Sequence, residues 1–545
     1  MSLSSENETE KEVVEMLAEE GLNATPDAVA EIASQKDPAS VVRRLAASCD
    51  AVVVTREDAR RATDTNATDN GTGSVANTEQ KPSTDPPDRP ASVGSDGSEP
   101  TKTVSSENES ENGEPDSLGS DSSSVTSSSS PSSSSPTEQP SNPTSTPTTR
   151  TPSEFDVTND ITAESTCTGE YTDFVGYFRD RFNQLSKTLR SRIQPRSVES
   201  AGSGGKDVAL VGMVNSVRTT SSDRDNRLVE IEDPTGTIRL LLSDDLVGTA
   251  ETLVVDEVIG VEGRLSDDGG MVFVDEVHFP EVPPRREPNT ASRDVKAVLV
   301  SDVHVGSDTF VGERWDIFAD WLTRQDDVEY VLVAGDLVEG VGIYPGQDEE
   351  LTTVDIYEQY RECAERFAQL PDDTEIITIT GNHDSVRLAE PQPALDERFR
   401  EPFGENVSFH GNPSVVTVEG VDVLMYHGMS LNPFAESLPH VEIEEPQTAM
   451  VEMLRKRHLA PMYGDVRLAP ETRDYLVIDQ VPDVLHTGHT HTVGAEKYRN
   501  VVTVNTGAWQ SQTPYQKAMN IQPDVGYAGV LDLSTLELDM KQFAP

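Results

Sequence analysis

The residues best suited to chemistry follow short apolar runs in the C-terminal half of the chain. Lys296–His304 reads KAVLVSDVH, in which an apolar run ends in Asp302 and His304. The run has the length and the β-branched content of a strand. Residues two apart on a strand point the same way, so we expect this carboxylate and this imidazole to face together. Such a pair is half of a metal site.

Four further apolar runs end in side chains of the same kind. EYVLVAGD ends in Asp336 and VDVLMYHG contains His427; the other candidates are Asn382, His383 and Asp384 in EIITITGNHD, and His489 and His491 in DVLHTGHTH. A single histidine is usually a core or surface residue, but half of the ten histidines in the chain fall in these clusters. Open α/β sheets place their sites at the carboxyl ends of strands, so the clusters predict one shared site.

The donor atoms in this set are oxygen and imidazole nitrogen, without cysteine. Such a set suits two divalent ions, for which we expect Mn²⁺ first, with Fe²⁺, Ni²⁺, Zn²⁺ and Mg²⁺ as alternatives. Asp336 has two carboxylate oxygens and could bridge ions ~3.5–4 Å apart. Two ions orient a phosphodiester and lower the pKa of a bridging water, which attacks phosphorus as hydroxide. His383, beside Asn382, could then protonate the leaving oxygen.

In this order, the motifs DxH, GD, GNHD and GHTH resemble those of the calcineurin-like metallophosphoesterases. The resemblance implies that one ion is held by Asp302, His304, Asp336 and His491. It implies that the other is held by Asp336, Asn382, His427 and His489. By the same resemblance His383 is the general acid and Asp384 orients it. His486 also precedes GHTH, and we interpret it as a packing or supporting residue.

Longer strings narrow the resemblance. VEGVGIYPGQ (338–347), MLRKRHLAPMYG (453–464) and NTGAWQSQTPYQ (505–516) are similar to the small subunits of archaeal family D DNA polymerases. The similarity covers about 170–545, with Glu339 where many relatives are expected to have Asp. It implies a 3′–5′ exonuclease that proofreads DNA primer–template 3′ ends for a large polymerase subunit. A sliding clamp is a further candidate partner. Related eukaryotic B-subunits have lost their metal ligands, whereas every ligand position is filled here.

Basic residues near the motifs are candidates for binding the substrate. Arg387 follows GNHD closely, and we expect it to contact the scissile phosphate. The densest basic patch is Arg455, Lys456 and Arg457, next to His458. Its two interpretations are a contact to the phosphate backbone and an ordinary solvated helix face.

The elements that must position these residues form an α/β, sandwich-type metallophosphoesterase domain over 292–545. Five short strand patterns over 206–285 predict an OB-fold barrel, and 166–205 is a helical connector. The barrel contains few aromatics, Phe273 and Phe279, so a structural or docking role is favoured over single-strand binding. The Ser/Thr/Pro-rich, acidic stretch 56–165 is expected to be a disordered linker. Residues 1–55 are expected to form a small helical module.

Composition sets limits on the environment. The chain has 97 acidic and 43 basic residues, a net charge of −54. The acids are spread along every segment, which favours the cytoplasm of a halophilic archaeon, where concentrated salt screens repulsion. Acidity of this kind does not exclude a DNA partner. Three distant cysteines predict no disulfide framework, and the lack of an apolar leader or span predicts no membrane partner.

Two other functions remain open from the sequence. A stand-alone metallophosphatase or phosphodiesterase would use the same ligands but would not need the barrel or the linker. A non-catalytic polymerase scaffold would need neither metal nor acid. Copurification with a large subunit separates the proofreading subunit from the first alternative, and metal-dependent hydrolysis separates it from the second.

Overall fold

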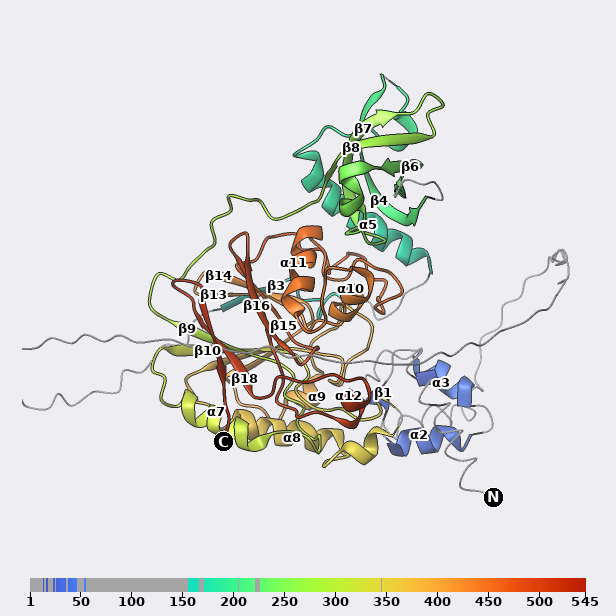
Figure 1. Cartoon of the computed structure of the whole chain (residues 1–545). Helices are drawn as coiled ribbons and strands as arrows, with labels where there is room; N and C mark the ends of the chain where they lie inside the picture. Colours follow the sequence, from blue (N-terminus) through green and yellow to red (C-terminus); the bar gives the residue numbers. More distant parts are fainter. Residues whose placement is uncertain are drawn as a thin grey trace, which may run out of the picture. The chain divides into compact units, whose positions relative to one another are not determined.

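A computed structural model describes residues 13, 16–17, 23–24, 26–35, 38–46, 53–54, 155–165, 171–203, 205–220, 226–344 and 346–545 (Figure 1). Most of the expected linker, 56–165, lies outside these ranges, and its disorder stays a prediction. In the N-terminal module, helices α2 (Pro26–Ala33) and α3 (Pro38–Ala46) share a small buried core that includes Ile32, Val42 and Leu45. Two-residue strands β1 (Asn23–Ala24) and β2 (Val53–Val54) pair in parallel.

A closed barrel is formed by five strands in the order β4-β5-β6-β8-β7, which confirms the expected OB-type fold. The strands are β4 (Asp207–Thr219), β5 (Arg227–Asp233), β6 (Gly236–Leu242), β7 (Val258–Leu265) and β8 (Met271–His278), with the short helix α6 (Val247–Ala250) between β6 and β7. Helix α5 (Tyr171–Arg190) packs Leu185 and Leu189 against Val211 and Val258 of the barrel. A single helix therefore occupies half of the expected connector, 166–205.

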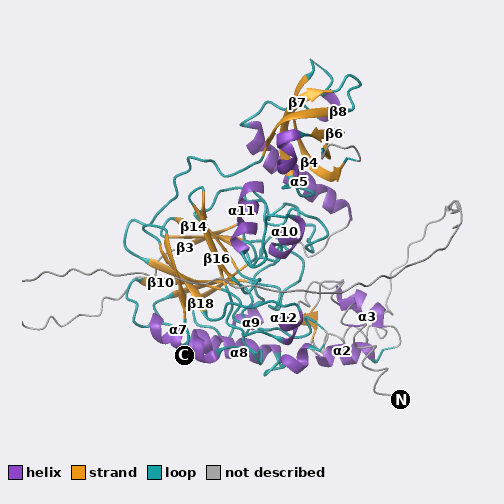
Figure 2. Ribbon diagram, viewed as in Figure 1, coloured by secondary structure: helices purple, strands orange, loops and turns teal. Residues whose placement is uncertain are grey.

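The phosphoesterase domain contains two six-stranded mixed sheets (Figure 2). The first has the order β12-β11-β10-β9-β18-β19, from β9 (Lys296–Val300), β10 (Val328–Ala334), β11 (Glu375–Ile379), β12 (Val407–His410), β18 (Tyr527–Asp532) and β19 (Glu537–Gln542). The second has the order β16-β17-β15-β14-β13-β3, from β3 (Phe155–Thr158), β13 (Ser414–Val418), β14 (Val421–Met425), β15 (Val484–Thr487), β16 (Val493–Tyr498) and β17 (Val501–Thr506).

Both faces of each sheet are buried, which is why the central strands read as continuous apolar runs. On β9, Ala297 and Leu299 join the core between the sheets, whereas Val298 and Val300 face helices. The first sheet is covered by α7 (Gly312–Leu322), α8 (Ile356–Phe367) and α9 (Glu397–Arg400), and the second by α10 (Leu431–Ser437) and α11 (Pro446–Lys456). This sandwich confirms the expected fold class.

Strand β3 corrects the expected boundary of the linker. Phe155–Thr158 was assigned to the linker, but it pairs antiparallel with β13 at the edge of the second sheet. Phe155 and Val157 pack against the core between the sheets. Four residues after a long polar stretch give too little periodicity to be recognised, and the pairing is made with a strand more than 250 residues away.

Helix α5 is joined to the phosphoesterase domain through a buried carboxylate. The Asp474 carboxylate accepts hydrogen bonds from Tyr177 Oη (2.7 Å), Arg181 Nε (2.7 Å) and His458 Nε2 (2.9 Å). All four side chains are fully buried. Among the described residues, no helix has the length and apolar character needed to span a membrane.

Candidate metal centre

The five apolar runs singled out in the sequence are strands β9, β10, β11, β14 and β15. The first three are parallel neighbours in one sheet, and the last two are parallel neighbours in the other. Their carboxyl ends deliver the candidate ligands to one place, where two donor clusters form. The first cluster is Asp302, His304 and His491, and the second is Asp336, Asn382, His427 and His489.

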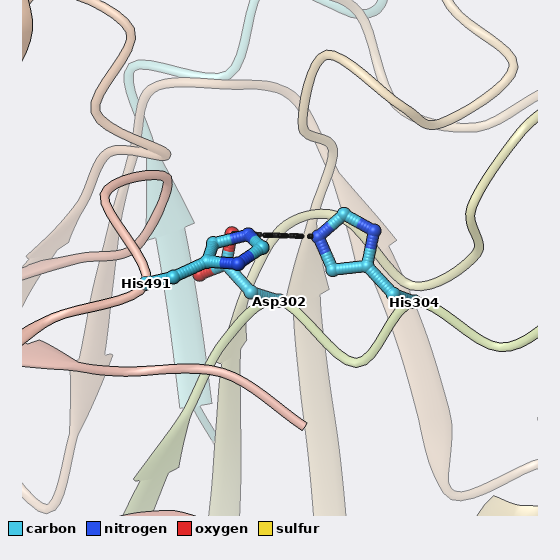
Figure 3. Close-up of side chains that lie close together, drawn as sticks. All are labelled: Asp302, His304 and His491. Carbon is cyan, nitrogen blue, oxygen red and sulfur yellow. Dashed lines mark hydrogen bonds and ion pairs between the residues drawn. The ribbon is translucent and has the colours of Figure 1, made fainter. Parts of the chain in front are cut away.

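The first cluster brings together residues from the ends of β9 and β15 (Figure 3). His304 Nε2 lies 3.0 Å from His491 Nε2, which is 3.4 Å from Asp302 Oδ1. His304 Nδ1 lies 2.9 Å from the Glu339 carboxylate, which only accepts. The proton is therefore on Nδ1, and the lone pair of Nε2 points into the cluster.

The second cluster is oriented in the same way. Nδ1 of His427 donates to the Ala334 carbonyl at 2.9 Å, so Nε2 is the nitrogen that faces the cluster. That Nε2 lies 3.2 Å from Asp336 Oδ2 and 3.0 Å from Asn382 Oδ1. His489 Nδ1 is 2.9 Å from the same Asn382 oxygen. Nitrogen and oxygen atoms of four side chains thus converge on one point, as ligand atoms do around a cation.

The spacing of these donors fits divalent ions. Ligand bonds of about 2.0–2.2 Å in tetrahedral or octahedral geometry put neighbouring donors about 3–3.5 Å apart. The contacts within the clusters are 2.9 to 3.4 Å, apart from 3.9 Å between His304 Nε2 and Asp302 Oδ1, and Asp336 Oδ2 also lies 3.7 Å from His304 Nε2. The Asp336 carboxylate therefore faces both clusters, as a bridging ligand would.

The local field favours positive charge. Burial opposes ionisation of His427, but the charge of Asp336 outweighs it and raises the pKa of His427 to about 10. Burial would raise the pKa of Asp302 and of Asp336, yet the hydrogen bond from His491 and the charge of His427, respectively, lower both. Burial lowers the pKa of His489 to about 3, which keeps its imidazole neutral and available as a ligand.

Left-handed backbone at the ligands changes the expected local geometry. Strand β9 ends at Val300, so Asp302 and His304 lie beyond it and do not alternate as strand residues. The φ angles of Asp302, His304, Asp336, His489 and His491 are +52°, +54°, +53°, +70° and +58°. Residues other than glycine rarely adopt this region, and such strain gathers at functional sites. The loops, and not the strand pleat, aim these side chains.

Two motif glycines make room for the carboxylates. A Cβ on Gly381 would lie 2.2 Å from Asp336 Oδ1, and a Cβ on Gly488 would lie 2.3 Å from Asp302 Oδ2. Neither position can hold a side chain while the carboxylate stays in place. The glycines of GNHD and GHTH are therefore part of the site's geometry.

His383 lies on the wall of the cavity that contains both clusters. Its Nδ1 donates to the Glu339 carbonyl at 2.8 Å, which leaves Nε2 for a substrate. Burial lowers the pKa of His383, but the charges of Asp336 and Glu339 raise it by a larger amount, so the net shift is upward. The ring is thus held, and its proton retained, at the edge of the donor clusters.

Asp384 differs from its expected role. Its carboxylate accepts from Gly381 N (2.9 Å), Leu337 N (3.2 Å) and Tyr360 Oη (3.2 Å), which ties together the loops after β10 and β11. Burial and the nearby Asp336 charge raise its pKa to about 7. The group that orients His383 is the Glu339 carbonyl, which corrects the expectation that Asp384 does so.

Comparison with known proteins places this geometry in a family. The family model for the calcineurin-like phosphoesterase superfamily domain matches residues 295–522. The DNA polymerase II small subunit of Halobacterium salinarum (strain R1) is 42% identical over 98% of each chain. That of Archaeoglobus fulgidus is 40% identical over 69% of this chain and 78% of its own. That of Methanothermobacter thermautotrophicus is 40% identical over 71% and 82%.

This chain belongs to the family of DNA polymerase II small subunits. The assignment confirms the resemblance found in the sequence. The strings VEGVGIYPGQ and NTGAWQSQTPYQ carried that resemblance. They also contain residues that lie around the donor clusters.

Glu339 supports the ligand His304, a role that the sequence did not reveal. Glu339 is 2% exposed. Its carboxylate accepts a hydrogen bond from Gln510 Nε2 at 2.6 Å in addition to the one from His304. Burial raises its pKa, but the charge and hydrogen bond of His304 lower it to about 2. Gln516 Nε2 similarly lies 2.8 Å from His491 Nδ1. The family strings were the only signal for these three residues.

The expected basic contacts to DNA lie elsewhere than at the site, and none of the four lines its cavity. Lys456 is 1% exposed, donates to the Thr252 carbonyl at 2.7 Å and pairs with Glu257 at 3.3 Å. Arg457, 6% exposed, donates to the Ile478 carbonyl at 2.7 Å. Burial and these hydrogen-bond and ion-pair partners within the protein give both residues structural roles, which corrects the expected phosphate patch.

The other two basic residues, Arg455 and Arg387, also contact side chains within the protein. The guanidinium of Arg455 lies 4.0 Å from the centre of the Phe279 ring in the barrel domain. Arg387 pairs with Glu471 at 2.8 Å. His486 is fully buried, and burial lowers its pKa to about 3, which fits the packing role expected for it.

Proposed function

We propose that this chain is the proofreading subunit of a two-subunit DNA polymerase and removes 3′-terminal nucleotides by two-metal hydrolysis. The observation that carries the proposal is the convergence of seven donor side chains, from five strand ends, around the shared carboxylate of Asp336. The names of the relatives, small subunits of DNA polymerase II, support a large polymerase subunit as the partner. DNA 3′ ends are the proposed substrate, and a sliding clamp is a further proposed partner.

In this proposal Asp302, His304 and His491 hold one ion with Asp336, and Asn382, His427 and His489 hold the other with Asp336. Divalent ions bound there supply Lewis acidity and lower the pKa of a water. Mn²⁺ is proposed first, with Fe²⁺, Ni²⁺, Zn²⁺ and Mg²⁺ as alternatives.

The chain itself supplies the proton and the alignment. His383 donates a proton from Nε2 to the departing 3′-oxygen, because its Nδ1 is fixed on the Glu339 carbonyl. The Glu339 carboxylate fixes the tautomer of His304, and Asp384 holds the two loops that carry Asp336 and His383.

Asp336→Ala in the full-length chain tests the proposal. We expect the purified variant, alone and with the large subunit, to lose bound metal and the release of 3′ nucleotides while its circular dichroism is retained. Asp327→Ala is the matched control, because Asp327 forms a surface ion pair with Lys296. Wild-type nuclease activity in Asp336→Ala would contradict the assignment. A wild-type chain that binds the large subunit but neither binds metal nor cleaves DNA would be a scaffold.

A further inference from the structure

The cavity around the donor clusters is larger than the metal centre needs. Its volume is about 960 Å³, at the upper end of the ~300–1,000 Å³ typical of small-ligand sites. The inner wall includes His383 and five of the seven donor residues, namely His304, Asp336, Asn382, His489 and His491. The outer wall includes Ile443, Tyr515 and Met519, which are 39%, 62% and 57% exposed. The metal centre therefore opens toward an apolar and aromatic rim.

This rim is unusual for the molecule. Among the described residues, nine large hydrophobic side chains are exposed, and three of them line this one cavity. Exposed apolar side chains that gather at a cavity mark a binding surface, whereas scattered ones need no explanation. Tyr515 is the aromatic member, and its ring offers a face on which a planar ligand can stack.

The polar groups of the same cavity are suited to nucleobases and not to phosphates. None of the residues that line it is Lys or Arg, and Glu444 adds a negative charge. Instead the wall carries side-chain amides, from Asn432, Gln510, Gln516, Asn520 and Gln522. Amides donate to and accept from base edges, whereas phosphate recognition relies on cations. Away from the metal ions, binding here must rest on stacking and amide contacts.

Tyr515 is held at a fixed place relative to the donor clusters. It lies on α12 (Pro514–Ala518), which Thr513 and Gln516 close with reciprocal hydrogen bonds of 3.2 and 3.1 Å. The same Gln516 contacts Nδ1 of His491 in the first cluster. A residue that supports a ligand and a residue that could bind a base are thus neighbours on one short helix.

We propose that Tyr515 is a stacking platform for the unpaired base at the 3′ end of the DNA strand, with Met519 and Ile443 beside it. The inference rests on the proposed exonuclease function and names its substrate class: single-stranded or frayed 3′ ends. A mispaired terminal base leaves the duplex stack at lower cost than a paired one, so it reaches the platform more often. The platform therefore selects for errors without reading base identity.

The test uses the full-length chain with its large subunit and three variants. Tyr515→Ala removes the ring, Tyr515→Trp keeps an aromatic face, and Phe273→Ala removes an aromatic that is 46% exposed on β8 of the barrel. The substrates are an oligonucleotide with an unpaired 3′ base and the same oligonucleotide with an abasic 3′ residue.

Stacking contributes ~1–3 kcal/mol per base, so Tyr515→Ala should raise KM for the unpaired 3′ base roughly 5- to 150-fold. Tyr515→Trp should restore KM, and Phe273→Ala should match wild type. For the abasic substrate, wild type and Tyr515→Ala should be equal. Equal KM values for wild type and Tyr515→Ala on the unpaired base, or the same loss in Phe273→Ala, would overturn the platform.

A binding measurement separates this inference from the proposed function. With metal chelated, 2-aminopurine at the 3′ terminus should lose fluorescence on binding wild type and Tyr515→Trp but not Tyr515→Ala, because stacking quenches it. Binding at the terminus should also change little across a KCl series, since phosphate contacts are what make affinity steeply salt-dependent. If wild type cleaves no substrate, the exonuclease proposal fails. If it cleaves normally but quenching survives in Tyr515→Ala, only the platform fails.

Discussion

Residue by residue, His304 and His427 turn Nε2 into the donor clusters while a carboxylate and a backbone carbonyl, respectively, hold Nδ1. His427 shows the consequence most clearly. With a pKa of about 10, it retains a proton that a metal ion must displace. Metal uptake should therefore release protons and strengthen as pH rises, the usual coupling for imidazole ligands.

For His383→Ala we expect metal content to stay at the wild-type level, because its ring is not in either donor cluster. The release of 3′ nucleotides should fall by ~10²–10⁴-fold, the usual contribution of a general acid. A diester with a nitrophenolate leaving group needs no proton and should lose far less. Metal content, exonuclease rate and nitrophenolate release are the measurements. Loss of metal from the variant would make His383 a ligand instead.

The donor residues could be predicted from sequence because each stands in a short motif at the end of an apolar run. The residues that support these donors could not be predicted from the sequence. Glu339, Gln510 and Gln516 act through contacts with His304 and His491 that join loops far apart in sequence. Lys456 and Arg457 looked like a solvated patch because their partners, Glu257 and the Ile478 carbonyl, belong to other segments.

Among the elements, the strand ends and the loops that follow them contribute differently to the position of the ligands. The strands fix where the loops start, and left-handed residues and glycines then bring the side chains together. Apolar runs predicted β9, β10, β11, β14 and β15, because buried parallel strands have this composition. The left-handed angles at Asp302 and Asp336 were not predictable, since nothing in a DxH or GD motif reports φ.

Gly488→Ala tests the loop geometry. Its new Cβ would collide with the Asp302 carboxylate, so Asp302 or the GHTH loop must move. We expect loss of metal from the first cluster and of hydrolysis, with overpacking costing ~1–3 kcal/mol of folding stability. Gly248→Ala on α6 is the control, because a Cβ there meets nothing within 4 Å. Normal metal content in Gly488→Ala would show that the close approach is not needed.

In the whole molecule, α5 joins the barrel to the phosphoesterase domain through a buried network around Asp474. Burial alone would raise the pKa of Asp474, but His458 and Arg181 lower it. Burial and the Arg181 charge lower the pKa of His458 from 6.5 to about 4. Its Nδ1 accepts from Ala460 N at 3.0 Å, so the neutral ring donates from Nε2 to Asp474.

Stability should therefore fall as the solution is acidified. Between pH 6.5 and about 4 the unfolded chain binds a proton at His458 that the folded chain refuses, so unfolding becomes easier toward low pH. The contribution is at most about 3 kcal/mol. Urea unfolding of wild type and His458→Gln across this range measures it. Wild type should lose its advantage over the variant as pH falls, and a constant difference would contradict the linkage.

Strand β3 has a consequence for the barrel. The chain leaves the second sheet at Thr158, forms α5 and the barrel, and enters the first sheet at Lys296 in β9. Both ends of the segment that contains α5 and the barrel are thus anchored in the sandwich, which raises the effective concentration of α5 beside Asp474. A shortened chain that began at the barrel, or at β9, would leave β13 with an unpaired edge that invites pairing with another molecule. Any recombinant fragment of this domain should accordingly start before Phe155.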